Sequence, residues 1–486
     1  MLDRERRVWL RVGAMLLVGC GVSACPTHAP PRGQAVRQKA LVHTSLATAW
    51  TSPGGLEGDI QDGWLATFAD EQLQSLVTEA LHHDPDLRAA AARVEQAAGY
   101  LGVARAALFP SLDVQGKESL GLGQGLTGVL RGIDISAGWE IDLWGKLRYR
   151  WNAAGESMAA AEAELEFARQ SMAATLAKGW FLATEAHLLR GIATQRVSMG
   201  EELVRLTTTR WQVGAASEQE VALAQASVES YRDTLKQAEL ARVRAVRAVE
   251  LLVGRYPAGA LAPREDLVEL PGAVPAGIPA SVLERRPDLL AAERRVAAAF
   301  DRMQEAKAAR LPSLRLTGAV GFVDSDVVVL RETLTNPAGG LAAGLLAPIF
   351  HGGALAAQVR IRTAEQEEAL AAYAAAALRA TNEVENALTS SMILRERRQL
   401  LEKALAGHER ALELLTIDYD VGKIDLRTLL QQNLLTDAAR ISLLRVRSEQ
   451  LLQRINLHLA LGGGFLTPAE AKPGGQQPIG SPTPGR

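Results

Sequence analysis

The amino-acid sequence is duplicated internally, and this repeat constrains the fold more than any other feature. Pro85-Asp86-Leu87 recurs as Pro287-Asp288-Leu289, 202 residues later. Two more anchors recur in the same order: Pro110-Ser111-Leu112 as Pro312-Ser313-Leu314, and Trp211-Gln212-Val213-Gly214 as Tyr419-Asp420-Val421-Gly422. Ordered anchors with little drift indicate a true repeat, so one structural plan must be present twice.

Each copy predicts the same order of secondary structure. A helix over 86–107, and again over 288–310, ends before a proline, which cannot continue a helix. Strands of alternating apolar and polar residues follow, at about 111–121, 133–144, 313–323 and 339–349. A very long helix, a glycine turn and a return helix complete each copy.

The second strand alternates most clearly. Its apolar positions are separated by polar residues or glycine, and they include Ile133, Ile135, Trp139, Ile141 and Leu143. A soluble amphipathic hairpin has the same local pattern. In an exported chain, however, strands of about ten residues with one apolar face are what an outer-membrane barrel requires. These five residues are therefore predicted to face lipid.

The long helices have a predicted length. No proline occurs between Pro110 and Pro257, or between Pro348 and Pro468. Continuous helices over 148–213 and 354–420 would each span on the order of 100 Å at 1.5 Å per residue and would pack as coiled coils. Gly214 and Gly422 are the predicted turns at the helix tips, because glycine accepts positive φ.

Four strands cannot close a barrel, and a bilayer does not tolerate an open sheet edge. Closure therefore requires other copies of the chain. Two copies give eight strands, whose interior side chains fill, whereas three copies give twelve strands and leave a lumen. A conducting protein of this plan is predicted to be a homotrimer.

The N-terminus predicts export with a lipid anchor. Arginines precede a short apolar stretch over 12–24, so residues 1–25 are typical of a signal peptide. Cys20 and Cys25 each follow small residues, as in the bacterial lipobox, and either is a candidate for the covalent N-terminal lipid. A plain signal peptide with incidental cysteines is the alternative. No cysteine follows position 25, which excludes an internal disulfide and a cysteine metal site.

Composition and motifs argue against other functions. The 53 basic and 55 acidic residues give a net charge of -2, with no basic cluster for nucleic acid. No serine lies in a nucleophile elbow, and no histidine pair has metal-ligand spacing. The glycine-rich segment 121–128 lies between candidate strands and not before a helix, so it is not a phosphate-binding loop. The sequence therefore predicts no catalytic residues, no metal site and no enzyme. Residues 466–486, rich in proline and glycine, are predicted to be disordered.

Several motifs in fixed order resemble the TolC-like outer-membrane efflux proteins, in the lipoprotein (NodT-type) branch serving RND efflux systems. They are Trp64 to Phe68 with Asp70 and Leu73, Asp84 to Leu87, Leu108 to Leu112, Trp139 to Arg148, Pro348 to Gly353, Glu383 to Leu388, and Ala460 to Gly464. The resemblance covers roughly 64–465.

This resemblance implies an α+β membrane protein in the outer membrane of a Gram-negative bacterium. Three chains would form a twelve-stranded transmembrane β-barrel, continued into the periplasm by an α-helical barrel. A periplasmic adaptor protein and an inner-membrane pump would load it. An N-terminal extension with an equatorial segment (26–84), two repeats (85–255 and 287–465) and a connecting equatorial segment (256–286) would make up each mature chain.

The family closes the periplasmic end with rings of side chains from the last return helix. By position, these rings correspond to Tyr419, Arg427, Gln431 and Leu434, with Asp425 as a possible partner of Arg427. Members often carry leucine, aspartate and arginine at the last three of these positions. The departure leaves open whether ion pairs close this gate.

A second hypothesis is a periplasmic coiled-coil lipoprotein that acts as an adaptor or spacer. The alternating strands discriminate, because an adaptor needs no lipid-facing sheet.

Overall fold

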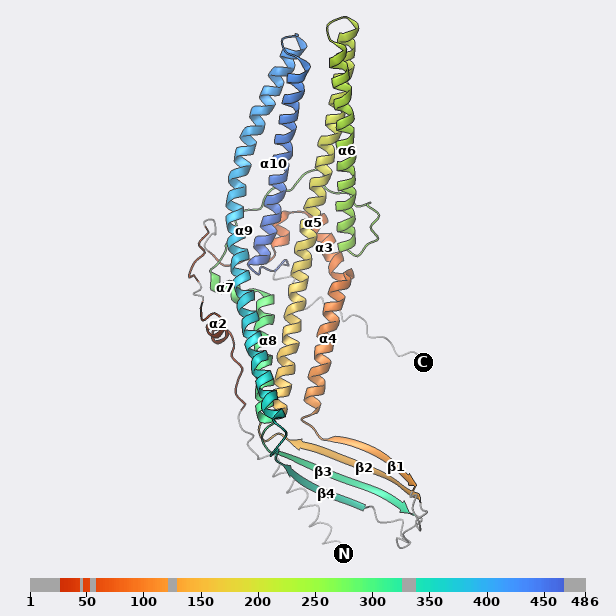
Figure 1. Ribbon diagram of the computed structural model, residues 1–486, viewed down its shortest axis with the longest axis vertical. Coiled ribbons are helices and arrows are strands. Elements are labelled where there is room, and N and C mark those ends of the chain that lie inside the picture. The colour runs from red at the N-terminus through yellow and green to blue at the C-terminus, as the bar shows by residue number, and fades with distance from the viewer. Residues whose placement is uncertain (1–26, 44–46, 53–57, 121–128, 326–337, 467–486) are drawn as a thin grey trace. The chain divides into compact units, whose positions relative to one another are not determined.

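The computed structural model describes residues 27–43, 47–52, 58–120, 129–325 and 338–466 (Figure 1). The predicted signal peptide, Cys20, Cys25 and the tail from residue 467 lie outside these ranges. The described elements are mostly helical, and they include one four-stranded sheet.

The two copies of the repeat have the same elements with the same lengths. The first helices, α4 (Pro85–Ala106) and α8 (Pro287–Ala308), have 22 residues each. The long helices, α5 (Lys146–Gln212) and α9 (Ala354–Asp420), have 67 residues each. The return helices, α6 (Glu218–Leu252) and α10 (Leu426–Ala460), have 35 residues each. Shorter helices lie outside these matched sets: α2 (Gln34–Ala40), η1 (Trp64–Phe68), α3 (Glu71–His83) and α7 (Pro279–Arg285).

Each copy contributes one antiparallel hairpin to the sheet. The strands are β1 (Ser111–Leu120), β2 (Val129–Ile141), β3 (Ser313–Ser325) and β4 (Ala338–Leu346), in the order β1-β2-β3-β4. All neighbouring strands are antiparallel, including β2 and β3, which pair across the two copies of the repeat.

Two predicted strand ends are corrected. β2 ends at Ile141, so Leu143 lies in the bend before α5 and not on the strand. The reason is Asp142, whose carboxylate accepts hydrogen bonds from the backbone N–H groups of Leu147 and Arg148 and so begins the helix. β4 ends at Leu346 rather than at residue 349, because Pro348 cannot donate to a strand ladder.

The described residues divide into two compact units. The first contains the sheet and comprises 27–42, 93–162 and 291–374. The second comprises the described parts of 43–92, 163–290 and 375–466. Its largest apolar core contains Trp64, Phe68, Trp180 and Phe181, all at most 2% exposed. Asp70 is fully buried there and accepts a hydrogen bond from Trp180 Nε1 at 3.0 Å, which satisfies both groups.

Candidate functional site

The strand register places most of the large apolar residues of the four strands on one face of the sheet. Directly opposed residues on neighbouring strands share a face. The rows across the sheet are Val114, Ile135 and Val320; Trp139, Leu316 and Ala343; and Ile141, Leu314 and Leu345. Four of the five residues predicted to face lipid therefore lie together, and Leu143 does not.

Among the described residues, nothing covers this apolar face. Leu112, Val114 and Ile133 are 76%, 73% and 63% exposed, and Leu341 of β4 is 87% exposed. Monomeric soluble proteins rarely expose contiguous apolar surface of this kind. The face is therefore built to contact an apolar medium.

The other face of the sheet is polar or small. One row across the sheet on this face is Asp113, Ser136, Ala319 and Gly340, and Gln115 lies opposite Asp134. At the end of β2, Glu140 lies opposite Arg315 and forms an ion pair with Lys146 at the start of α5. One apolar face and one wet face are the two requirements of a barrel wall around an aqueous lumen.

The two tryptophans at this end of the sheet have satisfied indole groups. Trp139 Nε1 donates to the carbonyl of Leu108 at 3.0 Å, and Trp144 Nε1 donates to that of Pro312 at 2.7 Å. Trp144 is also 40% exposed, and a tryptophan with a satisfied N–H and an exposed ring is typical of the membrane–water interface. No helix in the described part of the chain is long and apolar enough to cross a membrane.

The helix tips have the predicted turns. Gly214 has a φ of 74° and Gly422 a φ of 78°, a region that other residues rarely occupy. Each return helix then begins at a capping residue. Ser217 and Glu220 form a reciprocal capping box, and the Asp425 carboxylate accepts a hydrogen bond from the N–H of Thr428 at 2.9 Å.

The predicted gate residues have two different environments. Arg427, Gln431 and Leu434 are exposed and, at spacings of four and three residues, lie on one face of α10. Tyr419 is only 3% exposed. Its backbone carbonyl accepts a hydrogen bond from the Arg210 guanidinium at 3.0 Å, and that guanidinium also lies over the ring. Tyr419 therefore joins the two helical hairpins and does not share the exposed face.

The carboxylate of Asp425 has a capping role. The hydroxyl of Thr428 donates to it at 2.6 Å, and this bond, with the backbone bond from the same residue, lowers its pKa. The positive charge of Arg427 lowers the pKa further. Asp425 is thus an ionised helix cap next to Arg427.

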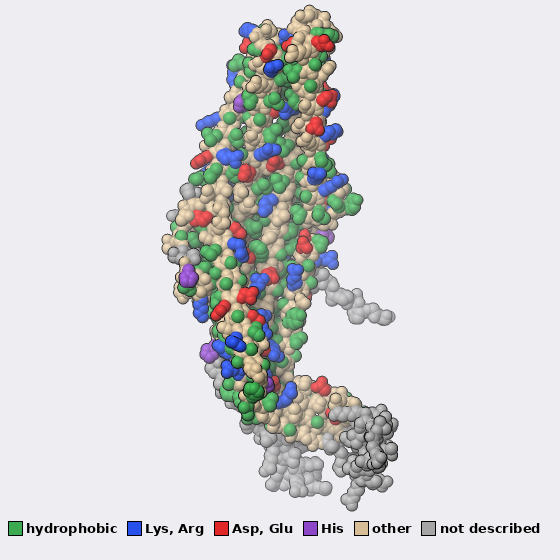
Figure 2. Space-filling view, viewed as in Figure 1, with side chains coloured by type: hydrophobic (Ala, Val, Ile, Leu, Met, Phe, Trp, Pro, Cys, Tyr) green, Lys and Arg blue, Asp and Glu red, His purple; other side chains and the backbone are tan. Residues whose placement is uncertain are grey.

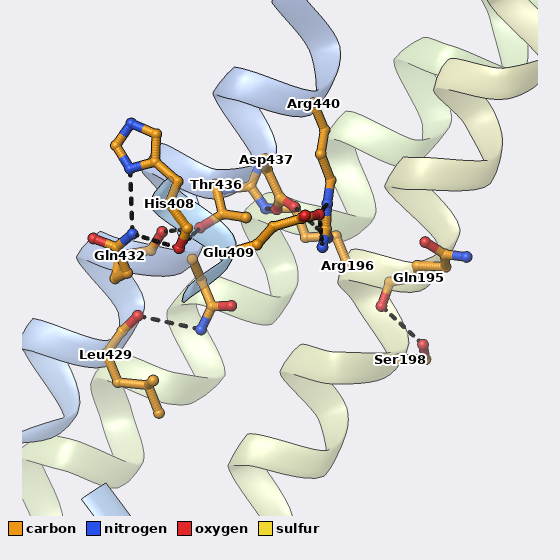
Figure 3. Close-up of polar contacts among 11 residues, drawn as sticks. Gln195, Arg196, Ser198, His408, Glu409, Leu429, Gln432, Thr436, Asp437 and Arg440 are labelled. Atoms are coloured by element: carbon orange, nitrogen blue, oxygen red, sulfur yellow. Dashed lines mark hydrogen bonds and ion pairs between the residues drawn. The ribbon is translucent and has the colours of Figure 1, made fainter. Parts of the chain in front are cut away.

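A polar network links the hairpins farther along α10 (Figure 3). Arg196 of α5 pairs with Asp437 of α10, with 3.3 Å between Nε and Oδ2, and its guanidinium lies 4.3 Å from the centre of the Tyr231 ring of α6. Arg440 of α10 pairs with Glu409 of α9 at 2.8 Å. Burial raises the pKa of Asp437, and the nearby charges of Arg196 and Arg440 oppose that rise.

Sequence reasoning missed this network. Arg196 and Asp437 lie in different copies of the repeat, and neither belongs to a short motif. Only helix packing brings them together. In the described residues, no cluster of three or more histidine, aspartate or glutamate side chains could hold a metal ion. The charged side chains of the helices are of both signs and are dispersed (Figure 2).

Comparisons with known proteins agree on one family. The profile described as "Outer membrane efflux protein" matches residues 76–255 and 278–463. The pyoverdine export outer membrane protein OpmQ of Pseudomonas aeruginosa is 31% identical over 423 residues, which is 84% of this chain and 88% of OpmQ. The cation efflux system protein CusC of Escherichia coli K12 is 26% identical over 93% of this chain and 98% of CusC.

A solved structure has the same fold over nearly the whole chain. The outer-membrane channel OprN superposes with a TM-score of 0.80 at 25% sequence identity, and the match covers 92% of this chain and all of OprN.

Proposed function

Because this chain belongs to the outer membrane efflux protein family, we propose that it is the lipid-anchored exit duct of a tripartite efflux system, loaded by a periplasmic adaptor and an inner-membrane pump. The protein is an efflux channel of the Gram-negative outer membrane. Three chains, with four strands each, close its barrel. The duct is passive, and its partners supply the energy.

The observation that carries the channel function is the sheet itself. It has one apolar face and one polar face. In the part of the chain that the structure describes, nothing covers the apolar face, and the two outer strands, β1 and β4, have no further strand partner. Neither edge can remain unpaired in lipid. An adaptor or spacer would not need such a sheet, so the sheet counts against that second hypothesis.

The experiment compares two adjacent residues of β1 that lie on opposite faces. Val114→Asp places a charge on the apolar face, whereas Gln115→Asp places the same charge on the polar face. We expect Val114→Asp to prevent insertion, so that the protein leaves the membrane fraction and gives no conductance in planar bilayers. Gln115→Asp should insert as a trimer and conduct. Equal insertion and conductance of the two variants would contradict the proposed role of the sheet.

The lipid anchor is supported by a contact of His28, which follows the two candidate cysteines in the sequence. The backbone N–H of His28 donates to the hydroxyl of Tyr149, in the first turn of α5, at 2.8 Å. That turn directly follows β2, so the described residues that come after Cys20 and Cys25 in the sequence contact the helix start next to the sheet. Mass spectrometry of Cys20→Ser and Cys25→Ser will identify the lipidated residue. Unchanged lipid content in both variants would refute an N-terminal lipid.

The adaptor is expected at the helix tips. Val213 and Val421 occupy equivalent positions in the two turns and are 76% and 63% exposed. The sequence contains only two cysteines, Cys20 and Cys25, so Val213→Cys and Val421→Cys each introduce a single new thiol there. Cross-linking in whole cells should join each variant to a periplasmic protein. Cysteine at exposed Tyr100 is the control, and an equal yield there would argue against docking at the tips.

A further inference from the structure

An N-terminal strap, defined here as residues 27–42, is fastened to the helices of the first unit. The N–H of Gly33 donates to the Glu293 carboxylate of α8 at 2.8 Å. Val36, in the short helix of the strap, is fully buried. The strap is therefore a packed element of this unit.

One carboxylate joins the strap to two long helices. Glu156 of α5 forms an ion pair with Arg32 of the strap and a second one with Arg294 of α8, the latter at 3.2 Å. The side chain of Glu156 is only 11% exposed, whereas those of Arg32 and Arg294 are 54% and 36% exposed.

A second acidic residue near this carboxylate has no such partner among the described residues. Asp301 of α8 is fully buried, and neither of its carboxylate oxygens has a hydrogen-bond partner there. It is already buried within a single chain, so a neighbouring copy cannot supply a donor. Burial, with the like charge of Glu156, raises its pKa to about 7, although Arg32 of the strap lowers it.

This arrangement is present once per chain, despite the duplication. At the offset of 202 residues, Glu293 corresponds to Ala91 and Asp301 corresponds to Gly99. Glu156, at the offset of 208 residues, corresponds to Ala364. Glu156, Glu293 and Asp301 therefore have no acidic counterparts at the equivalent positions of the other copy.

We propose that Asp301 is a proton-operated lock, which holds α5, α8 and the strap together while its carboxyl is neutral and loosens them when it ionises. A neutral carboxyl is tolerated in a buried site without donors, whereas a carboxylate there is poorly solvated and repels Glu156. The charges that act on Asp301 are Glu156 from α5 and Arg32 from the strap.

The sign of the pH dependence follows from the two protonation states. The native pKa is raised from 3.8 to about 7, so the packed unit keeps a proton that the opened unit has released. This contribution to stability is complete at low pH and is lost as the pH rises through about 7. Alkaline conditions should therefore loosen the strap.

Hydrogen exchange of the solubilised full-length trimer tests the lock without requiring conduction. We expect peptides from 27–42 and from α8 to exchange up to about tenfold faster near pH 8 than near pH 6, after correction for intrinsic rates. Asp301→Asn, which is neutral at both pH values, should abolish this difference. Glu305→Gln, on the same helix and paired with Arg150, should retain it.

Two results would overturn the proposal: equal protection of the wild type at both pH values, or an unchanged pH dependence in Asp301→Asn. If that variant does not fold, Glu156→Gln replaces it. Loss of the like charge lowers the pKa of Asp301, so the transition must move to lower pH. A transition that stays in place would refute the lock. Because conductance is not measured, these outcomes are independent of the channel proposal.

Discussion

Buried arginine and histidine side chains concentrate where α10 ends. Arg286, at the start of α8, is 4% exposed, and its guanidinium donates to both carboxylate oxygens of Asp288, at 3.0 and 2.8 Å, and to the carbonyl of Ala460 at 3.1 Å. At the offset of 202 residues the other copy has Asp84, which instead caps α4 by accepting a hydrogen bond from the N–H of Leu87. Two equivalent helices, α4 and α8, are thus preceded at equivalent positions by side chains of opposite charge.

Arg286→Met should destabilise the second unit by about 2 to 3 kcal/mol, because removal of a buried cation leaves Asp288 and the carbonyl without their partner. Thermal unfolding of the solubilised protein, followed by circular dichroism, measures the loss. Arg285→Met is the control. Arg285 pairs with Asp62 at 2.6 Å but is more than a third exposed, so its loss should be within about 1 kcal/mol. Equal losses would contradict the role of burial.

The burial of His458 leads us to expect that the stability of the protein depends on pH in the acid range. Its ring stacks on Trp64, with 5.9 Å between centres, and neither ring nitrogen has a hydrogen-bond partner. Burial, with the charge of Arg454, lowers its pKa from 6.5 to about 3. Below about pH 6.5 the imidazole therefore binds a proton in the unfolded chain but not in the folded chain. The free energy of unfolding falls as the pH drops from there toward 3.

His458→Phe retains an aromatic ring and removes this titration. The fall in Tm between about pH 7 and about pH 5 should be smaller in the variant than in the wild type. An identical fall in both proteins would show that titration of His458 does not cause the loss of stability. This dependence has the opposite sign to that of Asp301, which lies in the other unit.

At the scale of elements, turn chemistry determines where the long helices end. Both 67-residue helices end at a glycine with positive φ, and both 35-residue return helices begin at a side-chain cap. These are local signals, so the same sequence pattern gives the same element twice. Packing then differs, because Tyr419 in the second turn region is buried whereas Trp211, its counterpart, is 46% exposed.

Gly422→Ala should destabilise the protein by about 1 kcal/mol, because alanine is strained at a φ of 78°. Gly407→Ala is the matched control. Gly407 lies exposed inside α9, where an added Cβ meets nothing within 4 Å, so alanine should stabilise by up to about 1 kcal/mol. Opposite signs in thermal unfolding are the expected result, and a Gly422→Ala variant with raised Tm would contradict it.

At the scale of the whole molecule, a few polar contacts join the two helical hairpins. The pair between Arg196 and Asp437 joins the first hairpin to the second, next to a cavity of about 390 Å³ lined by residues that include Leu203, Leu412 and Tyr419. Loosening this contact lets the hairpins separate without breaking either one.

Asp437→Asn should raise the open probability of the trimer in planar bilayers, because it removes the charge that links α10 to α5. Glu413→Gln is the control, since Glu413 pairs with Arg410 within the same helix. The control should gate like the wild type. An unchanged open probability in Asp437→Asn would show that this pair does not restrain the hairpins.

The sequence by itself determined the duplication, the order and length of the helices, the turns at Gly214 and Gly422, and the alternation that places Ile133 and Trp139 on one sheet face. Each of these depends on local periodicity or on backbone preference, which neighbouring residues decide. Tertiary structure alone decided the burial of Tyr419 and Asp301 and the pairing of Arg196 with Asp437, because those environments come from helices far apart in the chain. Leu143 lies outside the sheet for a local reason, since the capping bonds of Asp142 compete with the strand pattern.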